Sequence, residues 1–171
     1  MVRNTVCRFQ GIISTFALTN SRKVITFRPL QAKDISLLLP MMEAFYKIDN
    51  YPFNALETEQ MLTEFVGNAS LGKIWLILDN EDVLGYVILT FIFSFEYKGK
   101  IAFLDELFVS EKARGKGAGK AALDFIQAEA ARLSLKLIYL EVEPHNETAQ
   151  QLYLSKDFEL HKRKLMKFIP R

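Results

Sequence analysis

A glycine-rich loop in the second half of the chain reads Arg114-Gly115-Lys116-Gly117-Ala118-Gly119-Lys120. It follows a strand-like run from Ile101 to Val109 and opens a helix-like run from Lys120 to about Leu133. Alternating glycines at a strand-to-helix turn let the backbone bend tightly and bring its N–H groups close to a ligand. The helix N-terminus behind them adds unpaired donors and a partial positive charge. The loop therefore predicts a site for a pyrophosphate, with a solvated surface loop as the alternative.

Two common phosphate-binding motifs do not fit this loop. A P-loop needs a glycine five residues before its Gly-Lys pair and a Ser or Thr after it, but Arg114 and Ala121 occupy those positions here. A dinucleotide-binding fingerprint needs the spacing G-x-G-x-x-G. Residues 115–119 give G-x-G-x-G instead, so neither motif describes the loop.

The composition is that of an ordinary globular domain. The chain has 171 residues, of which half are hydrophobic and a quarter are charged, and this length suits one domain with a sizeable core. The longest apolar stretch, Val87 to Phe95, is interrupted by Thr90 and Ser94 and is too short to span a membrane. Cys7 is the only cysteine, which excludes an intrachain disulfide. We expect a cytoplasmic protein without a membrane partner.

The charge is unevenly distributed along the chain. Residues 1–33 hold six basic residues and no acid, which leaves the remainder with 16 basic and 20 acidic residues, a net charge of −4. An acidic body argues against nucleic acid as the partner. We expect residues 1–21 to form a poorly ordered N-terminal extension and residues 22–171 to form one domain. A mitochondrial-type targeting segment and a nucleic-acid or membrane arm are the alternatives for the basic start.

The apolar periodicity predicts a mixed α+β fold. We expect helices after Asp34, over residues 56–66 and 120–133, and in a short segment after Asn146. Strands are expected over residues 24–30, 73–78, 83–95, 101–109 and 135–142, with a last strand or hairpin over residues 158–168. Turns at residues 79–82 and 97–100 make three of the strands antiparallel, and the apolar run of 135–142 places that strand in the sheet interior. The architecture is a central, mostly antiparallel twisted sheet with helices on both faces.

Three motifs in this order resemble the GNAT superfamily of N-acetyltransferases, and the resemblance covers about residues 24–168. The run Leu104-Asp105-Glu106-Leu107-Phe108-Val109 looks like the family's fourth strand, and residues 114–119 match its R-x-x-G-x-G coenzyme loop. The segment Asn146-x-x-Ala149-x-x-Leu152-Tyr153 is similar to the family's N-x-x-A-x-x-L/F-Y segment. The family usually continues with Gly-Phe, whereas this chain has Asp157-Phe158. We expect a left-handed residue there, which Asp tolerates better than most residues.

The resemblance implies an acetyl-coenzyme A-dependent N-acetyltransferase that works by direct attack of an amine and needs no metal. In this family the fourth and fifth strands splay apart, and the freed N–H groups hold the pantetheine arm and the acetyl carbonyl. The glycine loop would hold the pyrophosphate. The predicted coenzyme-binding residues are Leu107, Phe108, Val109, Arg114, Gly115, Lys116, Gly117, Ala118, Gly119, Lys120, Asn146, Ala149 and Tyr153.

Acetyl transfer to an amine requires a base for the amine proton, a donor for the thioester oxygen and a proton for the departing thiolate. Asp105, where several family members carry a glutamate, and Glu106 are the candidate bases, and Asp105 is slightly favoured. In a regular strand these neighbours face opposite sides. The resemblance places Tyr153 as the proton donor. Each of these residues also has a purely structural interpretation when it is taken singly. Asn146 fits a helix cap, Tyr153 fits a core position, and the two acids fit solvated positions on a strand.

The acceptor region of this fold lies among the first two helices, the loop between them, and the third and fourth strands. Aromatic rings with carboxylates there suit a small cationic amine: a polyamine, an aminoglycoside-like compound or an amino acid derivative. The alternatives are that these rings belong to the core, that the acceptor is a protein N-terminus or lysine, and that the domain only binds acetyl-coenzyme A. A homodimer is also open. The candidate residues are Tyr46, Asp49, Tyr51, Phe53 and Phe93, with Asn50, Glu57 and Phe95 nearby.

Overall fold

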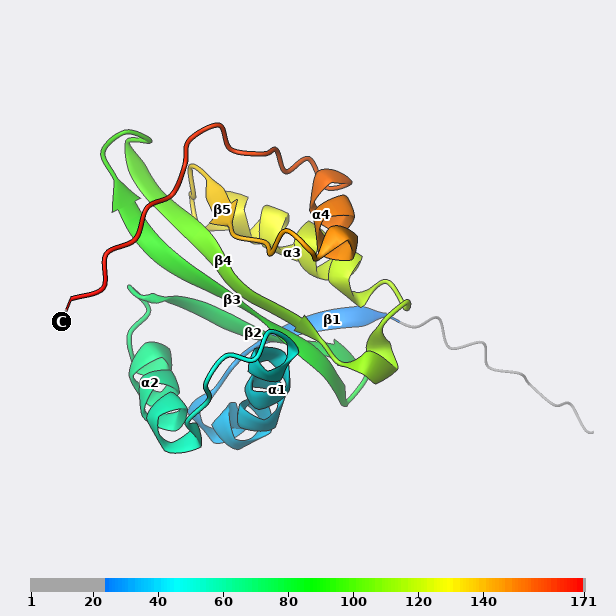
Figure 1. The fold of residues 1–171 in the computed structure, drawn as a ribbon. Helices are drawn as coiled ribbons and strands as arrows, with labels where there is room; N and C mark the ends of the chain where they lie inside the picture. The colour runs from blue at the N-terminus through cyan, green and yellow to red at the C-terminus, as the bar shows by residue number, and fades with distance from the viewer. Residues whose placement is uncertain (1–23, 171) are drawn as a thin grey trace, which may run out of the picture.

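Five strands form one sheet in the order β1-β2-β3-β4-β5 in the computed structural model, which describes residues 24–170 (Figure 1). The first four strands pair antiparallel, and β5 joins β4 in parallel. The prediction of a mixed fold with a mostly antiparallel sheet is confirmed. The strands are β1 (Ile25–Pro29), β2 (Gly72–Asp79), β3 (Asp82–Ser94), β4 (Gly99–Val109) and β5 (Ile138–Leu140).

Helices cover both faces of the sheet, as predicted (Figure 1). The first pair, α1 (Ile35–Ile48) and α2 (Ala55–Gly67), lies on one face, and α3 (Ala118–Arg132) and α4 (Glu147–Leu154) lie on the other. Two short 3-10 helices, η1 (Ala32–Asp34) and η2 (Glu111–Ala113), precede α1 and α3. No helix within residues 24–170 is long and apolar enough to cross a membrane. The predicted extension, residues 1–21, lies outside the described residues.

The two faces of the sheet carry separate cores because neighbouring strand residues point in opposite directions. Leu76 pairs with Tyr86, and both pack beneath α1 and α2. The adjacent pair, Trp75 and Val87, packs against Leu123 of α3 on the other side. The period-2 pattern of these strands therefore fixes which side chains can reach a site on either face.

Local sequence signals account for several turns and helix starts. Asn80 and Lys98 adopt left-handed backbone conformations in the two hairpin turns, and Asn54 caps α2 by accepting from the N–H groups of Leu56 and Glu57. Asp34 stands at the N-cap position of α1, where the sequence predicts that a helix begins, but its carboxylate makes no hydrogen bond to the first turn of that helix. It pairs with Arg28 at 2.7 Å and accepts from the N–H of Gln31 at 2.9 Å.

Two predictions at the end of the chain are wrong. The strand predicted for residues 135–142 shrinks to β5, which lies at the edge of the sheet and not in its interior. Residues 158–170 form no helix or strand, so the expected strand over residues 158–168 is absent. The cationic run at residues 162–164 interrupts the apolar alternation that this strand would need. An open groove of about 690 Å³ therefore lies between β5, α3, α4 and residues 157–163.

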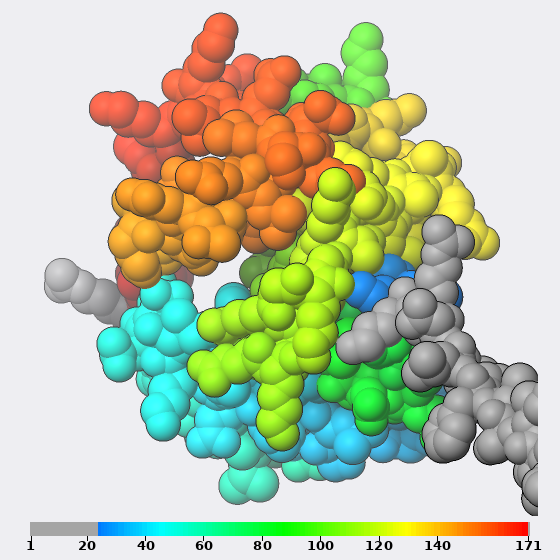
Figure 2. All heavy atoms as spheres, turned by 90° about the vertical axis from the view of Figure 1, so that its right-hand side faces the viewer, coloured from blue at the N-terminus to red at the C-terminus, as the bar shows by residue number. Residues whose placement is uncertain are grey.

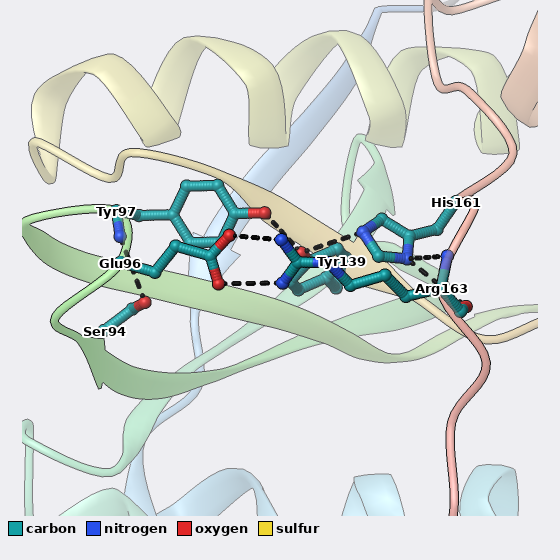
Figure 3. A network of polar contacts seen from close by, with 6 residues as sticks. All are labelled: Ser94, Glu96, Tyr97, Tyr139, His161 and Arg163. Atoms are coloured by element: carbon teal, nitrogen blue, oxygen red, sulfur yellow. Dashed lines mark hydrogen bonds and ion pairs between the residues drawn. The ribbon is translucent and has the colours of Figure 1, made fainter.

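Side chains hold the first part of this terminal segment against the β3–β4 hairpin (Figure 3). Arg163 makes a two-bond ion pair with Glu96, at 2.7 and 2.9 Å. The ring of His161 lies edge-on to Tyr139, whose hydroxyl hydrogen-bonds that of Tyr97 at 2.7 Å. The segment thus crosses β5 through side-chain contacts, without strand pairing.

Candidate active site

The strands β4 and β5 separate halfway along β4. Their pairing is confined to Ala102–Leu104 on β4 and Ile138–Leu140 on β5. β4 then continues to Val109, whereas β5 ends at Leu140. The β5-facing backbone groups of residues 105–109 therefore have no strand partner, which matches the splay that the family resemblance implies. Figure 2 shows a hollow surrounded by the glycine loop, α4 with the loop before it, and the loop after α1.

A β-bulge places the two candidate bases at the point where the strands separate. Glu106 pairs with Ile88 and Leu104 pairs with Leu89, so Asp105 is an extra residue opposite neither of them. A bulge of this kind bends the strand and re-aims its side chains. Leu104 consequently packs toward α3, whereas Glu106 meets Tyr86 of the core beneath α1. The regular alternation expected for Asp105 and Glu106 is interrupted here.

The environments of the two acids differ. Glu106 is only 7% exposed, and its carboxylate accepts a 2.6 Å hydrogen bond from the hydroxyl of Tyr86. Burial raises the pKa of Glu106, while hydrogen bonds from Tyr86 and Tyr46 oppose that rise. Asp105 is exposed, and partial desolvation together with the nearby charge of Glu141 raises its pKa. The pKa values of both acids are therefore raised toward neutral pH, where a carboxylate is a more effective proton acceptor.

The glycine loop has the backbone shape that the sequence predicts. Gly115 and Gly117 adopt left-handed conformations, with φ of 72° and 83°, and Gly117 is the N-cap of α3. Helical geometry leaves the N–H groups of the first turn, in Ala118, Gly119 and Lys120, without intrahelical partners. Gly119 has a different role from the other two, because a Cβ there would lie 3.2 Å from Leu152 of α4. It allows α3 and α4 to pack closely.

Basic side chains surround this helix N-terminus. Arg114, Lys116 and Lys120 are exposed, and the guanidinium of Arg114 reaches the carbonyl of Val109 at 3.4 Å. Free backbone donors, the helix dipole and these positive charges together suit a pyrophosphate. The loop therefore fits the phosphates of coenzyme A on the geometry of its own residues.

The remaining predicted residues lie on α4 or at its start, and Tyr153 lines the groove between β5, α3 and α4. Asn146 caps the helix by accepting from the N–H of Ala149 at 3.1 Å, so its structural role is established and its coenzyme contact stays a prediction. Tyr153 is half-buried and packs on Phe158, and desolvation raises its pKa. Its hydroxyl makes no hydrogen bond with any other part of residues 24–170. Asp157 has a φ of 63°, which confirms the expected left-handed residue.

Most of the predicted acceptor residues gather on one side of the acids. The ring of Tyr46 on α1 lies 5.7 Å from that of Phe53 and 6.5 Å from that of Tyr51. Tyr46 and Phe53 are partly buried against the core, whereas Tyr51 is 54% exposed. Burial and the charge of Glu106 raise the pKa of Tyr46 to about 12. The rings of Tyr46 and Phe53 thus pack against the core, and the ring of Tyr51 lies on the surface next to them.

Phe93 does not join this cluster. It contacts Phe95 near the β3–β4 turn, with 5.5 Å between ring centroids, and it pairs with Lys100 at the far end of β4. Ile88, the partner of Glu106, is five residues away along β3, which corresponds to roughly 17 Å in a strand. The structure therefore separates Phe93 from the other predicted acceptor residues.

Two contacts missed in the sequence join the loop after α1 to the loop after β5. The hydroxyl of Tyr51 donates to Glu143 at 2.8 Å, and Asp49 meets the imidazole of His145 at 3.2 Å. The hydrogen bond to Glu143 raises the pKa of Tyr51. Glu141 and Glu143 follow the strand β5, which ends beside β4. Their position after a predicted strand is the feature of the sequence that could have identified them as site residues. Within residues 24–170, no group of three or more His, Cys, Asp or Glu side chains is arranged around a metal.

Comparisons with known proteins agree with this geometry. The acetyltransferase (GNAT) family model matches residues 39–158. The D-amino-acid N-acetyltransferase HPA3 of Saccharomyces cerevisiae is 30% identical over 86 residues, which cover 47% of this chain and about half, 53%, of that relative. The uncharacterized N-acetyltransferase YhfO of Bacillus subtilis is 25% identical over 135 residues, which cover 79% of this chain and 90% of YhfO. The crystal structure of a predicted acetyltransferase from Clostridium acetobutylicum with acetyl-CoA has a TM-score of 0.71 at 19% identity, and the match covers 85% of this chain and 96% of that one.

Proposed function

Because the chain belongs to the GNAT family of acetyltransferases, we propose that it transfers an acetyl group from acetyl-coenzyme A to the primary amine of a small cationic molecule. The observation that carries this proposal is the opening between β4 and β5, with free backbone donors on residues 105–109 and an acid pair at its start. The glycine loop lies beyond the other end of this stretch. Donors for an acyl-coenzyme A and a base for an amine thus lie along one strand.

Each group has a definite task in a direct attack. The amine nitrogen forms a bond to the acetyl carbon and the bond from that carbon to sulfur breaks. Asp105 or Glu106 takes the amine proton, directly or through water, and Asp105 is slightly favoured because it is exposed. The backbone N–H groups of Leu107 and Val109, which face away from β3, orient the acyl arm and stabilise negative charge on the carbonyl oxygen. Tyr153, whose hydroxyl is not otherwise engaged, donates a proton to the leaving thiolate.

The charge of the acceptor side supports a cationic substrate. Asp105, Glu106 and Glu141 form no ion pair with a basic residue among residues 24–170. The carboxylate of Glu143, two residues after Glu141, accepts a hydrogen bond from Tyr51 and forms no ion pair within the described part of the chain. An ammonium group would supply the missing positive charge, and the rings of Tyr46 and Tyr51 can contact it through their faces. A free amino acid would bring its own carboxylate toward these acids, so an amine without a carboxylate is the better acceptor.

A protein N-terminus or lysine is the second candidate acceptor. The contacts of Tyr51 with Glu143 and of Asp49 with His145 bridge one side of the opening. An extended peptide needs an open groove there, so these contacts favour a small molecule. The single cysteine and the use of acetyl-coenzyme A remain compatible with a cytoplasmic enzyme.

A thiol-release screen with acetyl-coenzyme A as donor tests the proposal. Its acceptor arms are a polyamine, an aminoglycoside, a D-amino acid and a peptide with a free N-terminus. We expect release with the polyamine or the aminoglycoside, and loss of release in Asp105→Asn or Glu106→Gln. Glu64→Gln, an exposed acid on α2, is the matched control and should behave as the unaltered protein. Coenzyme binding without release in any arm would favour a non-catalytic module.

A further inference from the structure

Glu106 is an unusual residue for the core in which it lies. It is 7% exposed in the middle of the sheet and has no basic partner within residues 24–170. Burying a carboxylate is costly unless hydrogen bonds compensate it. Here the compensation comes from a neutral hydroxyl, because Tyr86 donates at 2.6 Å, and the hydroxyl of Tyr46 helps to oppose the rise that burial causes in the pKa of Glu106.

Tyr86 is fixed more firmly than its partner. It is fully buried on β3, and its ring stacks on Phe108, its partner across the sheet, with 5.7 Å between centroids. Glu106 lies diagonally from Tyr86, because Glu106 pairs with Ile88. A buried tyrosine has little freedom to change rotamer, so the direction of its hydroxyl is set by the sheet and not by solvent. The hydrogen bond therefore fixes the carboxylate as well.

Tyr46 connects this buried pair to the acceptor side. It extends from α1 to the carboxyl group of Glu106, and its ring contacts Tyr51 and Phe53. Tyr86, Tyr46 and Asp105 are the titratable groups that act on the Glu106 carboxyl from β3, α1 and β4. No cation is among them. The arrangement therefore runs from a fully buried hydroxyl, through a buried carboxylate, to the partly buried Tyr46, whose ring contacts the exposed Tyr51.

We propose that Tyr86 is a positioning residue that holds the Glu106 carboxylate ionised and aimed toward the acceptor amine through Tyr46. This rests on the proposed acetyl transfer, and it gives the two acids separate duties. Glu106 is the fixed anion that draws the ammonium group to the bulge and holds it there. Asp105, which is exposed, takes the proton of the amine and passes it to water.

The expected direction follows from which form of Glu106 the hydroxyl of Tyr86 stabilises. A hydroxyl that donates to a carboxylate favours the ionised form and lowers its pKa. Tyr86→Phe removes that donor and keeps the ring, so the pKa of Glu106 should rise by about one unit, the equivalent of one charge-assisted hydrogen bond. On the acid limb of the pH–rate profile, the rate of Tyr86→Phe should be about tenfold lower than that of the unaltered protein. At high pH the rates of the two proteins should converge.

Two measurements on the full chain test this. The first is a 13C NMR titration of glutamate side chains without substrate, in which the signal lost in Glu106→Gln identifies Glu106. The second is the pH dependence of kcat/KM with the best amine from the screen. Tyr97→Phe is the matched control, because it also removes one hydroxyl from a tyrosine pair, at the β3–β4 turn. It should leave both the titration and the profile unchanged.

The outcomes separate positioning from packing. An upward shift of the Glu106 pKa in Tyr86→Phe, with a matching shift of the acid limb, supports the proposal. The double variant with Tyr86→Phe and Glu106→Gln should have the same pH profile as Glu106→Gln alone. A lower melting temperature with an unchanged NMR titration would reduce Tyr86 to a packing residue. If Glu106→Gln retains the rate and profile of the unaltered protein, the proposal fails while acetyl transfer stands. If the unaltered protein transfers to no amine, the proposed function fails, and the NMR titration still decides the role of Tyr86.

Discussion

Replacing Gly117 by alanine or valine tests the coenzyme loop at its most constrained position. Gly117 has a φ of 83° and forms the N-cap of α3. A Cβ added there would meet no atom within 4 Å, so the free protein has room for a larger side chain. The restriction is conformational, because L-residues with a Cβ rarely adopt this region. The same Cβ would also stand where the backbone must approach a pyrophosphate.

The size of the effect follows from the left-handed conformation. Such a conformation costs a non-glycine residue roughly 1–2 kcal/mol. The free loop can relieve this strain by moving, but the bound loop cannot. The affinity for coenzyme A should therefore fall by about 5- to 30-fold in Gly117→Ala, since each 1.4 kcal/mol is about tenfold. A β-branched residue is a stronger outlier at positive φ, so Gly117→Val should abolish measurable binding.

Isothermal titration calorimetry with coenzyme A measures this without any acceptor. Circular dichroism should show an intact fold in both variants. Gly67→Ala is the control, because Gly67 ends α2, has open space around its Cβ position and has no positive φ. Unchanged affinity in Gly117→Val would refute the assignment of this loop as the pyrophosphate site.

Three further predictions concern chemistry, the N-terminus and pH. Tyr153→Phe should lower turnover by roughly a hundredfold to ten-thousandfold with little change in coenzyme affinity; near-normal turnover would leave Tyr153 a packing residue. Deletion of residues 1–21 should preserve coenzyme affinity and the melting temperature, and a fall of more than about 5 °C, roughly 1 kcal/mol or more, would show that the segment contributes to stability. Arg28 lowers the pKa of Asp34 below its usual value of 3.8, so this pair stabilises the fold above that pH and the contribution is lost as pH falls through the lower, folded pKa. Urea unfolding from pH 2 to 6 should therefore show a shallower acid loss in Asp34→Asn than in the unaltered protein.

The parts of the fold that follow from local sequence were predicted well. Turn residues such as Asn80 and Lys98 and the capping residue Asn54 act within a few positions of themselves, so their effect can be read along the chain. The glycine loop is also local, since its strand, turn and helix are consecutive.

The predictions that were wrong concern residues whose position depends on contacts with residues far away in the sequence. The apolar run at residues 135–142 suggested an interior strand, but a strand's place in a sheet is decided by which other strands pair with it. Residues 158–168 found side-chain contacts with Glu96 and Tyr139 and no strand pairing. Phe93 is an aromatic residue of the kind expected in the acceptor region. The register of β3 with β4, however, places it at the far end of the hairpin. None of these pairings is encoded by a local pattern.

The bulge at Asp105 joins the fold to the chemistry. In a regular strand Leu104 and Glu106 would share a face, and Glu106 would then point into the apolar core beneath α3. The extra residue moves Glu106 to the α1 side, where the hydroxyl of Tyr86 donates to its carboxylate. It also leaves Asp105 at the position where β4 and β5 separate. One unpaired residue in β4 therefore determines both where the acids point and which backbone groups remain free, and the sequence Leu104-Asp105-Glu106-Leu107 alone does not reveal it.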